Sequence, residues 1–306
     1  MRPASTDIAL RDSELEQTAR RLEATGNYRV LRRLVPRQPS VPPADGSEKL
    51  GIVLDVETTG LDHTRDEIIE LAMLKFRHTE SGKVTGVAAT FEALNEPLRP
   101  IPPEITKLTG ITDTMVAGQK IDHAAVEAFV AEADIVIAHH AAFDRMFVER
   151  VWPVFEHKAW ACSATEIDWK GFGYSGAKLS YLAVEAGFFY DAHRAIDDCH
   201  ALLELLASPL CGTGRTPLAV LLDAARRKTY RIWAEHSPYD LKEALKSRGY
   251  RWSNGADGSL KSWYIDVDES RREVEIKFLR DEIYQRDFDI RVVESTAHER
   301  FSVRQR

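Results

Sequence analysis

Asp55 and Glu57 stand two residues apart at the end of an apolar run, LGIVLDVET, that begins at Leu50. Side chains two apart on a strand point to the same face, so these carboxylates are expected side by side. Two like charges placed together away from water are costly unless a cation balances them. Mg²⁺ prefers carboxylate oxygens, water and phosphate as ligands. The pair therefore suits a metal site, although acids are equally ordinary where a strand emerges into solvent.

A third acid, Asp144, stands at the start of a helix predicted over 141–151, directly after the short buried strand IVIAH (135–139). An acid in a first helical turn complements the helix dipole, which is one explanation for it. Asp144 also borders the apolar stripe of that helix. This position faces the edge of the predicted sheet, so Asp144 is a second candidate metal ligand.

The segment AHRAIDDCHALLELL (192–206) supplies a fourth acid and a histidine. At ~100° per residue, the apolar side chains of this predicted helix gather on one face. Asp198 falls at the border of that face, whereas Asp197 points nearly opposite, so Asp198 is the better ligand candidate. His193 precedes the helix or opens it. Because imidazole titrates near neutrality, a histidine beside several acids and a metal is a candidate general base.

Three strands are predicted before the first helices of this region. Helices then alternate with one more strand, an order that predicts an α/β domain with a mixed sheet covered by helices. The strands are expected at 50–58, 67–76, 83–94 and 135–139, and the helices at 103–109, 112–118, 121–132, 141–151, 178–187 and 194–207.

Composition shifts divide the chain into three parts, predicted as 1–48, 49–225 and 226–306. Residues 1–48 read as a helical segment, with one or two short helices over 12–35, followed by a Pro- and Ser-rich linker. Residues 226–306 read as a small α+β domain. Its elements are expected as strands at 228–235 and 261–268 and helices at 238–249 and 269–281.

Three motifs resemble those of the DEDDh family of 3′→5′ exonucleases, in the family's order: DVETTGL (55–61), AHHAAFD (138–144) and HRAIDD (193–198). The segment IPPEITKLTGIT (101–112) is similar to the stretch between the first two motifs in proofreading members, such as the epsilon subunit of bacterial DNA polymerase III. The family also includes ribonuclease T and oligoribonuclease. The resemblance covers roughly residues 50–207 and implies a ribonuclease H-like fold, a mixed five-stranded sheet flanked by helices.

The resemblance implies a site with two Mg²⁺ ions, for which Mn²⁺ is a substitute. It carries over Asp55, Glu57, Asp144 and Asp198 as metal-site acids and His193 as the base that activates water. The expected reaction is hydrolysis of single-stranded DNA to nucleoside 5′-monophosphates. A separate group is expected to meet the terminal nucleotide: Thr58, Thr59, Gly60 and Leu61, together with His140, where relatives often have Asn.

Two other functions stay open at this point. The same acids serve exonucleases that trim RNA ends or degrade short oligoribonucleotides, although the 101–112 segment favours DNA over RNA. A catalytically silent nucleic-acid-binding module is the alternative of another class. The segment 1–48 or the unit 226–306 is expected to contact a polymerase or a DNA-repair partner.

The unit 226–306 interleaves aromatic with basic residues between 228 and 264. Such a pattern suits single-strand binding by stacking and phosphate contact, or else a small core packed with tryptophans. The aromatic residues are Tyr230, Trp233, Tyr239, Tyr250, Trp252, Trp263 and Tyr264.

The composition is ordinary for a soluble globular protein, with 44% hydrophobic and 29% charged residues in 306. No apolar run approaches the ~18–20 residues that span a bilayer, so no membrane partner is expected. The N-terminus lacks the apolar stretch of a secretory signal, and the three cysteines show no paired spacing, which indicates a cytoplasmic setting. A net charge of −7 argues against a surface coated in basic residues but permits a local basic groove.

Overall fold

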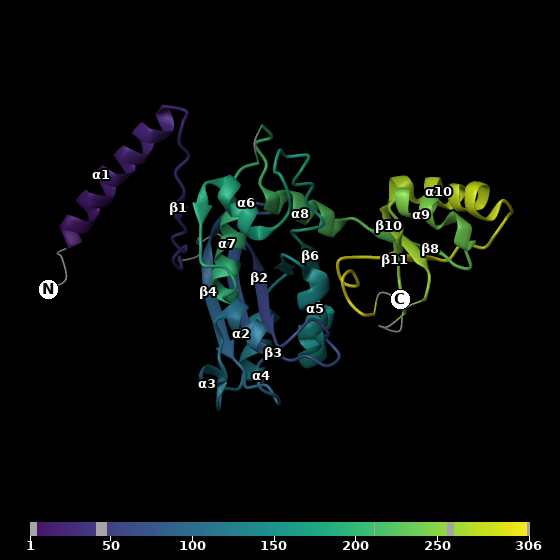
Figure 1. Cartoon of the computed structure of the whole chain (residues 1–306), viewed down its shortest axis with the longest axis horizontal. Helices are drawn as coiled ribbons and strands as arrows, with labels where there is room; N and C mark the ends of the chain where they lie inside the picture. The colour runs from purple at the N-terminus through teal and green to yellow at the C-terminus, as the bar shows by residue number, and fades with distance from the viewer. Residues whose placement is uncertain (1–4, 41–47, 211, 256–259, 305–306) are drawn as a thin grey trace.

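A mixed sheet of five strands, in the order β4-β3-β2-β5-β6, forms the larger unit of the chain (Figure 1). The computed structural model describes residues 5–40, 48–210, 212–255 and 260–304. β2 pairs antiparallel with β3 and parallel with β5, which makes the sheet mixed. The strands are β2 (Lys49–Thr58), β3 (Ile68–His78), β4 (Val84–Leu94), β5 (Ile135–Ala138) and β6 (Ala159–Cys162). The predicted α/β, ribonuclease H-like arrangement is confirmed.

Helices cover both faces of this sheet, and the side-chain alternation of β2 decides what each face meets. Ile52, Leu54 and Val56 lie in one apolar cluster with side chains of α4 (His123–Ala131) and α5 (Ala141–Val151). Val53 points the other way, into a cluster with α6 (Leu179–Ala186), α7 (Ala195–Ala207) and α8 (Pro217–Arg226). Because the period of a strand is two, Asp55 and Glu57 share the face of Val53.

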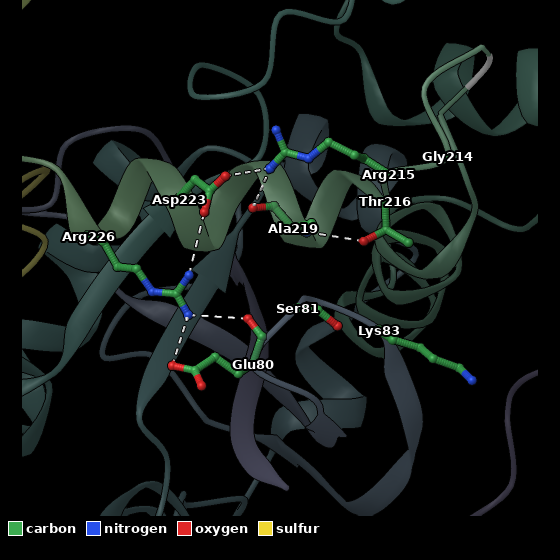
Figure 2. A pocket seen from close by; sticks show the side chains of 9 residues that line it. All are labelled: Glu80, Ser81, Lys83, Gly214, Arg215, Thr216, Ala219, Asp223 and Arg226. Atoms are coloured by element: carbon green, nitrogen blue, oxygen red, sulfur yellow. Dashed lines mark hydrogen bonds and ion pairs between the residues drawn. The ribbon is translucent and has the colours of Figure 1, made fainter.

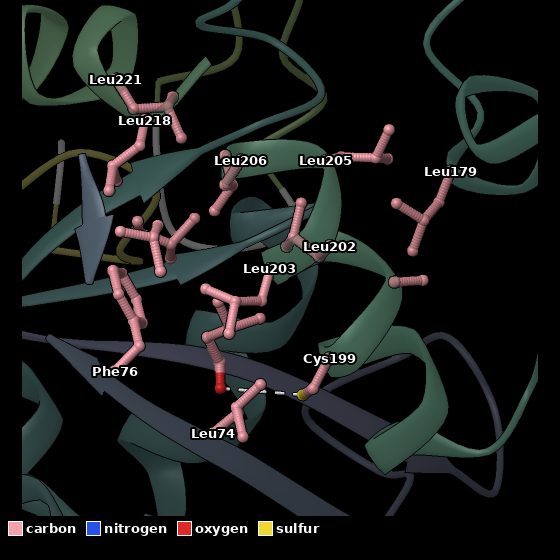
Figure 3. Packing of buried hydrophobic residues seen from close by; sticks show 14 of the residues in the cluster. Leu74, Phe76, Leu179, Cys199, Leu202, Leu203, Leu205, Leu206, Leu218 and Leu221 are labelled. Atoms are coloured by element: carbon pink, nitrogen blue, oxygen red, sulfur yellow. Dashed lines mark hydrogen bonds between the residues drawn. The ribbon is translucent and has the colours of Figure 1, made fainter. Parts of the chain in front are cut away.

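Helix α7 packs closely on that face (Figure 3). The Cys199 thiol lies 3.7 Å from the carbonyl oxygen of Val53 and 3.6 Å from that of Ala72. Leu202 and Leu203 follow it along the same side of the helix and are buried in the cluster that contains Leu74. The second turn of α7 is thereby fixed over the middle of β2 and β3.

The remaining connections contain short elements. Two helices lie between β4 and α4, and a 3₁₀ turn precedes β6. These elements are α2 (Pro103–Thr109), α3 (Asp113–Val116) and the 3₁₀ turn Pro153–His157. The sequence patterns did not predict β6 or α8. Across the described residues, no helix combines the length and the apolar character needed to cross a membrane.

The N-terminal segment differs from the predicted helices over 12–35. Helix α1 (Ser5–Ala24) ends earlier, and the chain then runs extended along the larger unit, where β1 (Arg32–Arg33) pairs parallel with β7 (Phe188–Phe189). Basic and apolar residues at three- and four-residue intervals suggested a helix there, but backbone pairing with β7 prevails. The predicted linker 36–48 lies partly outside the described residues, and Ser40 donates its N–H to the carbonyl of Val87.

A second sheet, in the order β11-β8-β10-β9, forms the C-terminal part. The predicted strands and helices of this part are present, and their apolar faces meet in a core of their own. The elements are β8 (Thr229–Ala234), the 3₁₀ turn Tyr239–Leu241, α9 (Lys242–Ser247), β9 (Arg251–Trp252), β10 (Trp263–Asp268), α10 (Glu269–Phe278), a π-helical turn (Leu279–Tyr284) and β11 (Val292–Ser295).

After β11 the chain returns to the larger unit. The N–H of Trp160 on edge strand β6 donates to the carbonyl of Ala297 at 2.8 Å. Arg300 pairs with Glu166 and donates to the carbonyl of Ala224 at the end of α8. The residues 296–304 therefore contact the larger unit, while the division predicted near residue 226 stays a prediction.

A pocket lies between the turn joining β3 to β4 and the start of α8 (Figure 2). Thr216 caps α8 and donates its hydroxyl to the carbonyl of Gly82 at 2.7 Å. The arginines of the pocket are paired, Arg226 with Glu80 and Arg215 with Asp223. By strand register this turn lies at the opposite end of β3 from the residues that face Asp55 and Glu57.

Candidate active site

Asp55, Glu57 and Asp198 form an acidic cluster at the carboxyl end of β2. One carboxylate oxygen from each lies within 4.8 Å of the others. The two strand acids share a face because they are two residues apart, and α7 brings Asp198 over that face. Asp197, one residue away on the same helix, is outside the cluster. The donor set is all oxygen, which fits a hard divalent cation such as Mg²⁺ or Mn²⁺.

Asp144 lies beside the cluster but is not one of its three members. Its side chain is buried in the first turn of α5, and one carboxylate oxygen accepts the N–H of Val56 at 3.3 Å. Burial and, after it, charge repulsion from Asp144 raise the pKa of Asp55, so these two carboxylates are neighbours. The structure thus brings the four predicted acids to one end of β2.

The carboxylates of the cluster have raised pKa values, because they are buried near one another with little positive charge to balance them. Burial, followed by repulsion from Asp198 and Glu70, raises the pKa of Glu57 to about 8. Burial raises the pKa of Asp144 to about 7 and that of Asp55 well above its usual range. A bound cation would offset this repulsion and favour the anionic carboxylates, which is the behaviour of a metal site.

His193 stands at the rim of the cluster, exposed to solvent. Its backbone N–H donates to Asp198 at 2.8 Å, so the turn before α7 is tied to a cluster carboxylate. Its φ is 72°, a left-handed conformation that is uncommon for a residue other than glycine. The left-handed turn at His193 therefore lies against the carboxylate of Asp198.

The loop after β2 holds the residues predicted to meet a terminal nucleotide. The hydroxyl of Thr58 donates to the carbonyl of Gly60 at 2.6 Å, and Thr59 exchanges hydrogen bonds with Glu67. A side chain at Gly60 would collide with Asp66, since a Cβ there would lie 2.4 Å from a carboxylate oxygen. Leu61 is 86% exposed, a free apolar side chain beside the site.

His140 lies at the N-terminus of α5, exposed, in edge contact with the ring of His139 at 5.0 Å. His139 is buried between the hydroxyl of Ser163 and the carbonyl of Ala177. Burial and the neighbouring His140 lower the pKa of His139 to about 4, so this ring is a neutral structural support.

Two residues that support the cluster were not predicted. Glu70 on β3 is fully buried, and its carboxylate accepts the N–H of Ala195 at 3.0 Å and pairs with Arg194 at 2.7 Å. It therefore holds the start of α7. Tyr190 donates its hydroxyl to Asp198 at 2.8 Å. An acid inside the apolar run EIIELAMLKF was a signal for Glu70, whereas no spacing pointed to Tyr190.

The comparison with known families fits this geometry, because a family model described as Exonuclease matches residues 52–206, the span that contains the cluster. The chain belongs to this exonuclease family. The predicted membership of the 3′→5′ exonucleases and the predicted enzyme class are thereby confirmed. Residues 5–40 and the C-terminal sheet of this exonuclease lie outside the match.

Relatives of this exonuclease are bacterial DNA polymerase III proteins. The DNA polymerase III PolC-type of Caldanaerobacter subterraneus is 30% identical over 165 residues, which is 52% of this chain but 11% of that protein. The DNA polymerase III PolC-type of Halalkalibacterium halodurans is 39% identical over 100 residues, 32% of this chain and 6% of that protein. The DNA polymerase III subunit epsilon of Treponema pallidum is 29% identical over 163 residues, 50% of this chain and 73% of that protein.

Solved structures also resemble the exonuclease. Exonuclease X in complex with 5′ overhanging duplex DNA has a TM-score of 0.40 at 23% identity, over 56% of this chain and 89% of that one. The zinc-bound E. coli ExoI–ssDNA complex has a TM-score of 0.47 at 14% identity, over 72% of this chain and 63% of that one.

Proposed function

We propose that this protein is a divalent-metal-dependent 3′→5′ exonuclease that hydrolyses single-stranded DNA to nucleoside 5′-monophosphates. The observation that carries the proposal is the acidic cluster of Asp55, Glu57 and Asp198 inside the exonuclease match. DNA is favoured over RNA because the relatives are DNA polymerase III proteins. The same relatives support a polymerase or DNA-repair partner, reached through 1–48 or 226–306.

Asp55, Glu57 and Asp198 would hold Mg²⁺ or Mn²⁺, and Asp144 would be the fourth acid of the metal site. The bound cations would supply positive charge that offsets the phosphodiester and the charge developing on it. An imidazole nitrogen of His193 would accept the proton of the attacking water. The loop Thr58–Leu61 and His140 would contact the terminal nucleotide, with Leu61 against its base.

The test is a time course on a 5′-labelled strand with and without Mg²⁺ or Mn²⁺, run in parallel on single-stranded DNA, duplex DNA and RNA. We expect stepwise shortening from the 3′ end, fastest on single-stranded DNA and absent when EDTA replaces the metal. Asp55→Asn should nearly abolish it while the protein stays folded, which a thermal melt checks. His193→Ala should slow it by about 10²–10⁴-fold. Equal cleavage by wild type and Asp55→Asn would exclude this site, and preferential cleavage of RNA would reassign the polymer.

A further inference from the structure

Large apolar side chains lie exposed where the N-terminal segment runs beside α6 and β7. Tyr28 and Val35 come from that segment, and Tyr181, Val184 and Phe189 come from α6 and β7. Tyr181 is 59% exposed and Tyr28 is 60% exposed. Isolated exposed apolar residues are normal, but a group on adjoining segments marks an interaction surface.

Backbone contacts make these segments one surface. Arg32 and Leu34 donate their N–H groups to the carbonyls of Gly187 and Phe189, at 3.1 and 2.9 Å. Arg29 donates to the carbonyl of Val184 at 2.8 Å, near the end of α6. Figure 1 shows the extended β1 segment running beside α6. We call Tyr28, Arg33, Lys178, Tyr181, Val184 and Phe189 the α6–β1 patch.

A cationic side chain lies over each of two aromatic rings of the patch. The guanidinium of Arg33 lies 5.0 Å from the centre of the Phe189 ring, and the ammonium of Lys178 lies 5.3 Å from the centre of the Tyr181 ring. Arg33 also pairs with Asp191 at 2.8 Å, but its side chain stays 60% exposed. Exposed rings beside cations suit nucleobases, which stack, and phosphates, which are anionic.

Two chain connections link the patch to residues of the site. Phe189 is followed directly by Tyr190, whose hydroxyl binds Asp198. At the other end, Lys178 follows Ala177, whose carbonyl accepts a hydrogen bond from His139, the neighbour of His140. A strand whose 3′ end lies at the cluster can therefore leave the site over the patch.

We propose that the α6–β1 patch binds the 5′ portion of the single-stranded nucleic acid whose 3′ end occupies the acidic cluster. The inference rests on the proposed function for the location of the 3′ end. Residues 28–35, which supply Tyr28 and Arg33 of the patch, lie outside the family match. The N-terminal segment would thus give this exonuclease a grip on longer strands that the matched domain lacks.

The experiment uses the full chain and fluorescence anisotropy of a labelled single-stranded DNA of about 20 nucleotides in EDTA, with one of about 3 nucleotides for comparison. Tyr181→Ala should weaken binding of the long strand by about tenfold or more, the effect of one lost stack. In the Arg33→Gln, Lys178→Gln double variant, the association constant should depend less steeply on salt. The magnitude of the slope of log K against log salt should fall by about 0.7 per lost phosphate contact. Lys83→Gln, which removes an exposed cation at the β3–β4 turn, is the matched control.

In Mg²⁺, kcat/KM should fall for the long strand and stay unchanged for the short one. Loss on both strands alike would place these residues in the catalytic site and overturn the proposal. Unchanged long-strand binding by the variants, or no binding by wild type, would overturn it too and favour a protein partner. If wild type binds through the patch yet cleaves no strand in Mg²⁺ or Mn²⁺, the proposed function fails while the patch stands.

Discussion

The hydroxyl of Tyr190 donates to one carboxylate oxygen of Asp198 at 2.8 Å, while the N–H of His193 donates to the other at the same distance. Asp198 is therefore held from both sides, and its orientation toward Asp55 and Glu57 is set before any cation arrives. Burial raises the pKa of Asp198, and the two hydrogen bonds oppose that rise by stabilising the anion.

Tyr190→Phe should weaken cation binding without unfolding the protein, because it removes only the hydroxyl. A hydrogen bond to a charged group contributes about 1.5–3 kcal/mol, so the Mg²⁺ concentration for half-maximal activity should rise by roughly tenfold or more. A metal titration of single-strand cleavage measures it. Tyr284→Phe, which removes a hydroxyl that donates to the carbonyl of Glu235 in the C-terminal part, is the matched control and should leave the titration unchanged. A Tyr190→Phe enzyme with the wild-type metal requirement would show that Asp198 is placed without this bond.

Asp198→Asn should cripple cleavage far more than Asp197→Asn. Asp198 belongs to the acidic cluster, whereas Asp197 on the same helix lies outside it. The two variants change the same charge at adjacent positions, so each controls for the other. Turnover at saturating Mg²⁺, with a thermal melt of each protein, gives the comparison. Equal losses, or the reverse order, would mean that the register of α7 over β2 does not govern the chemistry.

The four acids could be predicted because each follows a short-range rule. Period two places Asp55 with Glu57, and helical period separates Asp198 from Asp197. Glu70 was not predicted. Its place beside the site depends on strand register, which pairs it with Glu57 across β2 and β3. The extended course of residues 28–35 was missed for a similar reason. Its local pattern favours a helix, and only a strand distant in sequence overrides that preference.

Metal-free protein should lose stability as pH rises. The pKa of Glu57 is raised from 4.5 to about 8, so between these values the folded protein keeps a proton that the unfolded chain has released. Stability from this group is full below 4.5 and is lost as pH rises through about 8. Melting temperatures in EDTA across that window should fall, and Mg²⁺ should restore them most at the alkaline end.

Asp55→Asn is the control for that pH effect. It removes one repelling carboxylate, so its metal-free melting temperature at alkaline pH should exceed that of wild type and respond little to Mg²⁺. Sodium chloride at matched ionic strength accounts for general screening. A flat wild-type melting curve in EDTA, or an equal Mg²⁺ response in Asp55→Asn, would contradict an electrostatically frustrated cation site.

The last prediction concerns Arg145, the residue after Asp144 in α5. Its side chain is fully buried, pairs with Glu149 at 2.6 Å, and donates to the carbonyls of His298 and Arg300, each at 2.6 Å. A buried guanidinium that loses its partners is costly, about 3–5 kcal/mol. From sequence, Arg145 is an ordinary helix-surface arginine, because the carbonyls that accept its hydrogen bonds lie in residues 298 and 300, far along the chain.

Deleting residues 296–306 should therefore destabilise the exonuclease unit and not only the C-terminal sheet. The deletion leaves Arg145 without its carbonyl acceptors and removes the Ala297 carbonyl that pairs with edge strand β6. We expect a clear drop in melting temperature, and a higher Mg²⁺ requirement in the protein that remains folded, because Asp144 shares the first turns of α5 with Arg145.

Arg145→Met should act in the same direction. Arg65→Met is the matched control, since Arg65 pairs with Asp62 at the surface, where ion pairs contribute about 0–1 kcal/mol. If the shortened chain melts and titrates like the full one, residues 296–304 are a passive tail, and a protein ending near residue 225 should be an intact enzyme.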